Sequence, residues 1–327
     1  MERTVCTVRA AGCCRSTPTA GIASIASAAG IASAAGVALA MLLAAPSAAI
    51  AQAPFACFAF QLGNESAGCA ASGAAEDIRG GLGIGHSGGA SLPGTASALG
   101  RRFGATPRIA FAGRASLVRF DRTSADSWGA GPGSGNAASG WSPVFGATIG
   151  VGAFDGFSAA PTVSGVLGVD VLADVSTVRL PSDDSFEGAS TAWGYGVRVG
   201  LIRESFTLPG ASVSVMRRSG ASYVMEGEDG SLDADVTTTS IRATLGKELL
   251  GFGVHGGVGW DRVSTAGRIQ ADGSGGPAVE IDFDDERETH TVVFGGVTRT
   301  FLVTSIGADI GWSGDVAFGS ISLRLTL

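Results

Sequence analysis

The sequence predicts an all-β protein: a closed antiparallel transmembrane β-barrel of about 12 strands, with 10 as the alternative, short turns at one end and longer loops at the other. Apolar residues alternate with small or polar residues over segments of ten or more positions, which is the periodicity of β-strands. Only 16% of the residues are charged and the mean hydropathy is +0.31, although glycine interrupts every apolar run after position 53. Because the chain is hydrophobic but contains no long apolar helix after the first 51 residues, its apolar side chains are expected on one face of the β-strands.

The first 51 residues are expected to form a cleavable signal peptide. Basic residues before position 16 precede an apolar centre at Val37–Ala45, and Ala49, Ile50 and Ala51 form the small-x-small pattern at which signal peptidase cuts. The apolar centre is shorter than the roughly 20 residues that a membrane-spanning helix needs. The predicted organisation is a signal peptide at 1–51, an N-terminal periplasmic segment or plug at 52–77, and the barrel at 78–327.

The expected mature chain is acidic and keeps two cysteines. The first 51 residues carry a net charge of +2, which leaves −9 of the total of −7 on the remainder. This balance argues against nucleic acid as a partner. Cys57 and Cys69 lie twelve residues apart, and in an exported chain they are candidates for one disulfide.

Eleven segments show strand-like alternation. They are 78–86, 106–120, 143–155, 162–175, 190–203, 205–217, 236–247, 251–263, 288–301, 303–313 and 315–327. An even number is expected if both termini stay on one side of the membrane. Either a further strand lies within 53–100, or 78–86 is not a strand. Within the longer links, segments 223–235 and 269–284 contain further alternation, so some strands are expected to project past the membrane.

The two faces of these strands predict which side meets lipid. Trp193, Tyr195 and Val197 share one face of a segment whose other face carries Gly194, Gly196 and Arg198. The polar face has too few charges to be the outside of a soluble sandwich, so it is interpreted as the lumen and the apolar face as the lipid surface. Candidate lumen-lining residues are Arg114, Asp170, Asp174, Arg198, Arg242, His255, Arg299, Asp309 and Arg324.

These charges allow two interpretations. Arginines that face acids across an open bore would sort solutes by charge. Alternatively, interior charges pair with one another and fill a narrow barrel. Bore width decides between the two, and it grows with the number of strands.

The last strand resembles a known export signal. Ile321, Leu323, Leu325 and Leu327 alternate with Ser320, Ser322, Arg324 and Thr326 up to the final residue. This pattern resembles the C-terminal recognition strand of bacterial outer-membrane β-barrel proteins of the porin-like superfamily, with Leu327 in place of the usual terminal aromatic. The resemblance implies an outer-membrane location, short periplasmic turns, and outer-membrane lipid, lipopolysaccharide and the barrel-assembly machinery as partners. It identifies no specific family.

No motif predicts catalysis, a cofactor or a metal site. Of the three histidines, only His255 is expected on a lumen face, and no base–nucleophile constellation accompanies it. Residues 83–88 match G-x-G-x-x-G, but Pro93 follows where a dinucleotide site needs a helix. The acidic clusters at 226–235 and 282–286 are expected in external loops, either solvated or bridged to lipopolysaccharide by divalent cations.

The function that follows from this class is a passive pore or uptake channel for small solutes. The alternative is a structural or adhesive barrel with ligand-binding external loops and no open channel. A lumen packed with side chains or occupied by an N-terminal segment would favour the alternative.

Overall fold

The computed structural model describes residues 80–81, 83–102, 106–122, 138–158, 165–179, 189–227, 230–271, 279–314 and 316–327. The expected signal peptide, the segment 52–77 and the candidate disulfide of Cys57 and Cys69 lie outside these residues. Among the residues described, no helix is long and apolar enough to cross a membrane.

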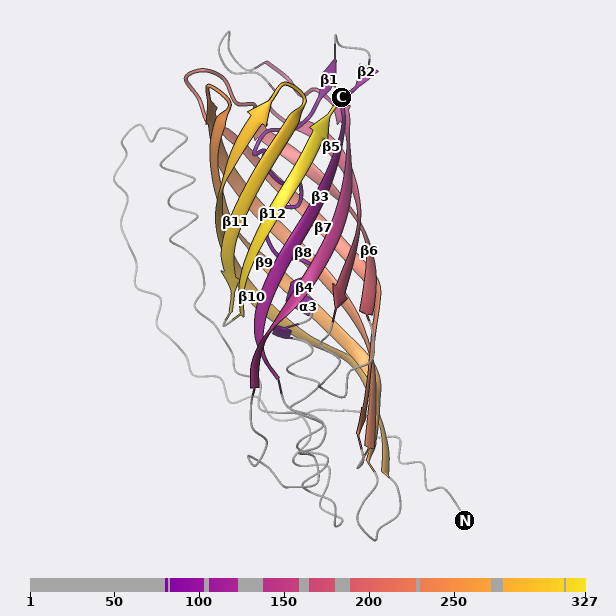
Figure 1. Ribbon diagram of the computed structural model, residues 1–327. Helices are drawn as coiled ribbons and strands as arrows, with labels where there is room; N and C mark the ends of the chain where they lie inside the picture. Colours follow the sequence, from indigo (N-terminus) through magenta and orange to yellow (C-terminus); the bar gives the residue numbers. More distant parts are fainter. Residues whose placement is uncertain are drawn as a thin grey trace, which may run out of the picture.

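Ten antiparallel strands close into a barrel (Figure 1). They are β3 (Ile109–Arg122), β4 (Ala138–Phe154), β5 (Gly168–Arg179), β6 (Ala189–Ile202), β7 (Gly210–Gly227), β8 (Gly230–Leu249), β9 (Phe252–Ala271), β10 (Val279–Phe301), β11 (Thr304–Ser313) and β12 (Val316–Thr326). Each strand pairs with its neighbour in sequence, and β12 pairs with β3. The barrel prediction is confirmed with its alternative number of ten, and the preferred number of twelve is wrong.

Of the two alternatives for segment 78–86, the one in which it is not a strand is confirmed, because Gly83–Gly85 forms the single helical turn α3 inside the barrel. The glycines in this segment alternate with other residues as the small residues on the inner face of a strand do, so the sequence pattern alone does not distinguish the two structures. Next along the chain, β1 (Arg101–Arg102) and β2 (Thr106–Pro107) form a two-stranded sheet at the end of the barrel where the C-terminus lies (Figure 1).

Two-residue links join strands at both ends of the barrel, with β7 to β8 and β11 to β12 at the end opposite the C-terminus. At the end that holds the C-terminus, β8 joins β9 through Leu250 and Gly251, and β10 joins β11 through Leu302 and Val303. The positive φ angles of 54° at Leu250 and 77° at Gly251 are those of a two-residue turn whose twist suits a β-hairpin. Short turns mark the periplasmic side of bacterial barrels. Following the expectation from the sequence that the short turns are periplasmic, we name the end that holds the C-terminus the periplasmic end and the opposite end the external end.

Strands β7 to β10 extend past the rest of the barrel at the external end (Figure 1). Pairing continues to Gly227 and Gly230 between β7 and β8, and to Ala271 and Val279 between β9 and β10. These positions fall within segments 223–235 and 269–284, where the sequence predicts projecting strands. The four strands form one sheet because β8 also pairs with β9 along this whole length.

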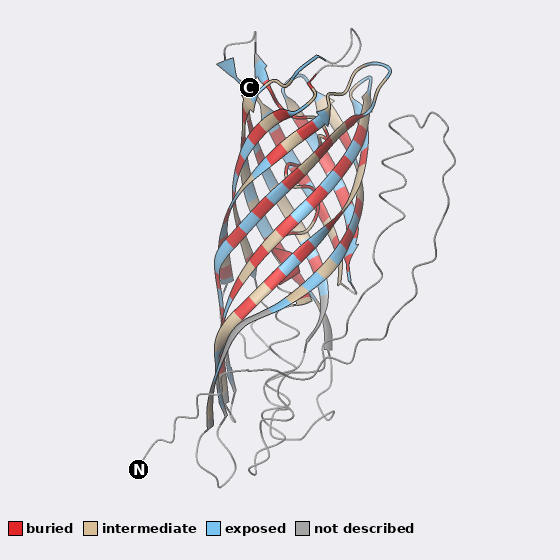
Figure 2. Ribbon diagram, turned by 180° about the vertical axis from the view of Figure 1, so that it is seen from behind, coloured by how far each residue is buried: buried red, intermediate tan, exposed pale blue. Residues whose placement is uncertain are grey.

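Burial alternates along every strand, so that the barrel has two chemically distinct faces (Figure 2). In β8, Ser240, Arg242 and Thr244 are buried, whereas Ile241 and Leu245 are exposed. The exposed face is thus the apolar one, which is the reverse of a soluble protein and the expected arrangement in lipid. Closure is required there, since an unpaired strand edge in hydrocarbon leaves backbone groups without partners.

Exposed aromatic side chains mark both ends of this apolar face. Toward the external end the outer face carries Trp141, Trp193, Tyr195 and Trp312. Toward the periplasmic end it carries Phe111, Phe154, Phe252 and Phe301. Aromatic girdles of this kind lie at the two membrane interfaces of transmembrane barrels.

Candidate functional site: the lumen and the segment threaded through it

Residues 83–100, which we call the threaded segment, run through the lumen from the external end to the periplasmic end (Figure 1). Gly83 lies against Val236 and Val263, toward the external ends of β8 and β9. Leu99 bonds to Asp170, near the periplasmic start of β5. The sequence allowed for a plug within 52–77, and the part of the described chain that occupies the lumen lies just after that range.

The external half of the lumen is an apolar ring around the start of the threaded segment. Its members, which we call the valine collar, are Val118, Val144, Val178, Val236, Val263 and Val292, all at most 2% exposed. A Cβ on Gly85 would lie 3.5 Å from Val144 Cγ2, and one on Gly83 would lie only 2.6 Å from Val263 Cγ1. Ile84 between them is completely buried. The turn fills the collar closely, and the collar leaves no room for a larger residue at position 83.

The periplasmic half holds the threaded segment by its backbone. Arg242 Nη2 donates to the carbonyl of Ser87 at 3.2 Å. Arg324 Nη1 donates to the carbonyl of Pro93 at 2.9 Å. Two further wall arginines act in the same way, with Arg114 donating to Gly88 and Arg198 donating to Thr95. In the opposite sense, Asp170 accepts from the backbone N–H groups of Leu99 and Gly100.

Side chains of the threaded segment add further bonds. The His86 ring bonds to Ser176 Oγ at 2.8 Å through Nδ1 and to Tyr223 Oη at 2.7 Å through Nε2. Ser87 Oγ donates to Asp261 at 2.8 Å. Ser91 Oγ and Ser214 Oγ lie 2.6 Å apart. The segment is therefore bonded to the wall along most of its length.

Three arginine–aspartate ion pairs and one histidine–aspartate pair lie inside the described part of the barrel. Arg198 contacts Asp170, Arg218 contacts Asp174 and Arg242 contacts Asp261, each at 2.7 Å, and His255 Nε2 contacts Asp309 at 2.6 Å. All eight side chains are buried. Buried charges are tolerated when they are paired and hydrogen-bonded, which is the arrangement here.

Two of these pairs span three strands, with a glycine on the middle strand. Gly194 of β6 lies in register between Asp174 of β5 and Arg218 of β7. A Cβ on Gly194 would lie 1.8 Å from Asp174 Oδ1. Gly296 of β10 lies in the same way between His255 and Asp309, and a Cβ there would lie 2.1 Å from Asp309 Oδ1. These glycines clear the path along which the two side chains meet.

The structure places eight of the nine candidate lumen residues on the inner face. They are Arg114, Asp170, Asp174, Arg198, Arg242, His255, Asp309 and Arg324. The prediction for Arg299 is wrong. In β10 the buried positions include Phe294 and Thr298, so Arg299 points outward, and its guanidinium lies 3.7 Å from the centre of the Phe252 ring. A long cationic side chain near the membrane interface can sit on the outer face because its charge reaches the polar headgroups.

Sequence reasoning missed three members of the site. Arg218 lies one position beyond the predicted strand 205–217, although strand alternation extended by one residue places it on the lumen face. Asp261 lies on the polar face of the predicted strand 251–263 but is not among the candidate lumen-lining residues. His86 belongs to the threaded segment, whose position inside the barrel no periodicity could indicate.

His255, the histidine expected on a lumen face, lies buried on the inner wall. His255 has a carboxylate partner, and Ser320 Oγ donates to the other oxygen of Asp309 at 3.3 Å. The cavity at the periplasmic mouth does not include His255. Within the described ranges, no group of three or more His, Cys, Asp or Glu side chains could hold a metal ion.

No protein-family model matches the chain, and no curated protein matches it. One similar solved structure is the translocator domain of the autotransporter NalP from Neisseria meningitidis, with 12% identity over 67% of this chain and 87% of that chain and a TM-score of 0.40. Another is OpdQ from Pseudomonas aeruginosa, with 9% identity over 68% of this chain and 98% of that chain and a TM-score of 0.14. The scores are too low to transfer a function. A closed antiparallel barrel with an apolar outer face and two aromatic girdles is the architecture of an outer-membrane β-barrel.

Proposed function

We propose that the protein is a closed outer-membrane barrel, kept shut by its own threaded segment, that acts as a binding platform at its external end. This is the alternative that the sequence left open beside the passive pore. The observation that carries the proposal is the threaded segment, which is bonded to the wall from Gly83, at Thr238, to Gly100, at Asp170.

Three properties of the lumen support closure. Ten strands make a narrow barrel, because the diameter grows with strand number. The wall charges bind one another and the threaded segment, which leaves few of them to face a solute. The valine collar closes around Gly83–Gly85, and an apolar constriction excludes water and ions.

The external extension of β7 to β10 supplies the platform. Its sheet exposes acidic side chains, among them Asp233, Asp235 and Asp282. Arg268 binds Asp282 at 2.8 Å and Glu280 at 2.9 Å across β9 and β10. An acidic, firmly paired sheet suits a partner that binds through divalent cations, and lipopolysaccharide phosphates are such a partner. Catalysis has no part in this proposal.

Conductance in planar bilayers tests closure. We expect the purified wild-type barrel to give no steps of the size of an open pore, whereas a continuous polar path would give steady conductance. The double variant Ser91→Cys/Ser214→Cys should cross-link under oxidation, because the two native oxygens lie 2.6 Å apart, and should stay silent. The single variants are the controls. Steady conductance of the wild type, or of the oxidised double variant, would contradict the proposal.

Sedimentation with lipopolysaccharide vesicles tests the platform. We expect binding in magnesium and its loss in chelator. Asp233→Asn/Asp235→Asn should weaken binding several-fold, and Arg217→Gln, which removes an exposed charge from β7, should not. Binding that ignores both magnesium and the acidic pair would contradict this part of the proposal and leave the closure result standing.

A further inference from the structure

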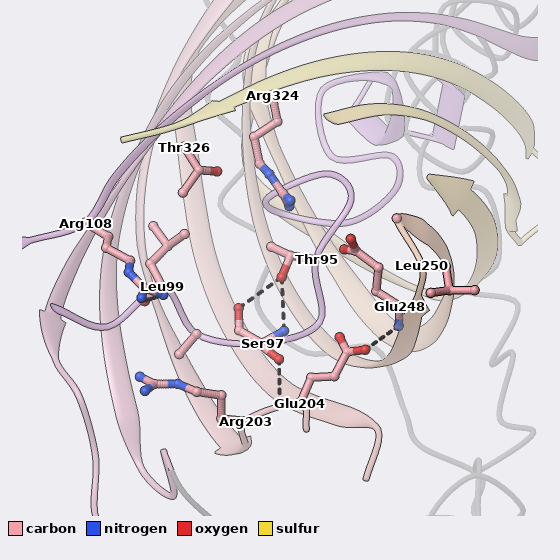
Figure 3. A pocket seen from close by; sticks show the side chains of 12 residues that line it. Thr95, Ser97, Leu99, Arg108, Arg203, Glu204, Glu248, Leu250, Arg324 and Thr326 are labelled. Atoms are coloured by element: carbon pink, nitrogen blue, oxygen red, sulfur yellow. Dashed lines mark hydrogen bonds between the residues drawn. The ribbon is translucent and has the colours of Figure 1, made fainter. Parts of the chain in front are cut away.

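A cavity of about 400 Å³ opens at the periplasmic mouth of the barrel (Figure 3). The threaded segment forms one side through Thr95 and Ser97. The turn after β6, with Arg203 and Glu204, and the end of β8, with Glu248, form others. Arg324 of β12 points into the cavity from the wall (Figure 3). Cavities of this size hold small molecules in many proteins.

Arg324 differs from the other buried arginines of the lumen wall. Arg198, Arg218 and Arg242 each contact an aspartate at 2.7 Å. Arg324 is only 8% exposed, yet among the described residues no carboxylate lies within ion-pair distance of it.

Its neutral bonds satisfy only part of the guanidinium. One Nη group of Arg324 donates to the Pro93 carbonyl at 2.9 Å and the other to Ser305 Oγ at 3.1 Å, while Nε has no partner. A buried guanidinium without a counterion is costly, and an oxyanion is its best complement because it accepts several N–H groups at once. The cavity beside Arg324 is where such an oxyanion would fit.

Two carboxylates face the cavity, one from the turn after β6 and one from the end of β8. Glu204 accepts a bond from the backbone N–H of Glu248, so the two side chains are held near each other (Figure 3). They would repel a second negative charge and attract an ammonium group. Thr95 and Ser97 of the threaded segment line the same cavity (Figure 3).

We infer that this cavity binds a small zwitterion, with its oxyanion on Arg324 and its ammonium group on Glu204 and Glu248. The oxyanion is a carboxylate, as in an amino acid or a short peptide, or a phosphate, as in an aminoalcohol phosphate headgroup. The inference does not depend on whether the barrel conducts, because the cavity lies at the periplasmic mouth and opens outward from the threaded segment.

Calorimetry on the full-length protein in detergent tests the site with two zwitterions, glycylglycine and 2-aminoethyl phosphate. We expect at least one of them to bind, and the one that binds identifies the oxyanion. Acetate, methyl phosphate and ethylamine carry one charge each and should bind at least tenfold more weakly. The inference would be overturned by the absence of heat with both zwitterions at millimolar concentrations. It would also be overturned if the zwitterion that binds did so no more tightly than the simple anion with the same oxyanion.

Variants separate ligand binding from stability. Arg324→Gln should abolish binding, but it also removes two bonds to the lumen and could loosen the fold. Glu204→Gln/Glu248→Gln gives a second measurement, because it should remove the preference for zwitterions and leave the simple anion bound. Arg217→Gln is the matched control and should bind as the wild type does. Unchanged zwitterion selectivity in the double glutamine variant would rule the assignment out.

Discussion

The two halves of the lumen hold the same threaded segment by different means. Around Gly83–Gly85 the valine collar fits by shape, and Thr238 supplies a hydrogen bond to the Gly83 carbonyl at 3.1 Å. From Ser87 onward the wall contributes arginines, an aspartate and hydroxyl groups that bond to the segment. A shape-based fit tolerates no added volume, whereas a charge-based fit tolerates no missing partner. The two halves should therefore fail under different substitutions.

The largest loss is expected in the charged half. Asp170→Ala would leave Arg198 buried without a counterion and the N–H groups of Leu99 and Gly100 without an acceptor. Breaking a buried pair in this way costs about 3–5 kcal/mol. Urea unfolding followed by heat-modifiable gel migration measures it. The control Asp282→Ala breaks an exposed pair with Arg268 and should cost only about 0–1 kcal/mol. If the two variants lost similar amounts of unfolding free energy, the buried pair of Asp170 and Arg198 would contribute no more to stability than the exposed pair of Asp282 and Arg268.

A second loss should follow from filling the glycine gap between paired charges. Gly194→Ala would place a Cβ 1.8 Å from Asp174 Oδ1 and force Asp174 and Arg218 apart. Overpacking of this kind costs typically about 1–3 kcal/mol. Gly113→Ala is the matched control, because a Cβ on this β3 glycine meets nothing within 4 Å. Urea midpoints that agree for the two variants would contradict the role of Gly194.

A smaller loss is expected in the apolar half. Gly83→Ala would place a Cβ 2.6 Å from Val263 Cγ1, at a cost of about 1 kcal/mol. Val263→Ala should restore part of this stability in the double variant, since it removes the methyl group that is struck. Gly80→Ala serves as the control, with nothing within 4 Å of its Cβ. Purely additive losses in the double-mutant cycle would show that the two positions do not touch.

The smallest effect concerns pH at the periplasmic turns. Burial raises the pKa of the Glu204 carboxyl above its usual value. The folded protein then binds more protons than the unfolded chain between these two values, so stability falls as pH rises through that window. Glu204→Gln should reduce the fall in melting temperature that the wild type shows as pH rises above the ordinary glutamate pKa. The group is partly exposed, so the change should be slight. The prediction would be contradicted if the melting temperature of the wild type rose with pH over this window and Glu204→Gln removed the rise.

Most of the wall was predictable because lipid imposes a strict alternation. In β6, the pattern of Trp193, Tyr195 and Val197 against Arg198 placed every side chain on the face where it is found. Arg299 was misplaced because both faces of β10 carry apolar residues, with Phe294 inward and Phe301 outward, so hydropathy does not settle its direction.

The threaded segment was the main feature that alternation could not reveal. Glycine is required at Gly83 because the backbone approaches the valine collar closely. This requirement produces no repeating pattern in the sequence. The match of residues 83–88 to a nucleotide-binding motif has the same origin. Pairing of the lumen charges was foreseen as one of two alternatives, but the partners of Asp174 and His255 lie two strands away, at a separation that sequence distance does not encode.

The glycine-bridged pairs also bear on how the barrel assembles. Asp174 and Arg218 meet only when β5, β6 and β7 are all aligned, and His255 and Asp309 meet only when β9, β10 and β11 are. If a hairpin paired with its neighbour in a register shifted by two residues, a charged side chain would be buried inside the narrow barrel without its partner. An unpaired buried charge is strongly destabilising. Each pair therefore favours the native strand register, because it forms only when the three strands are correctly aligned and is lost in a barrel that closes in another register.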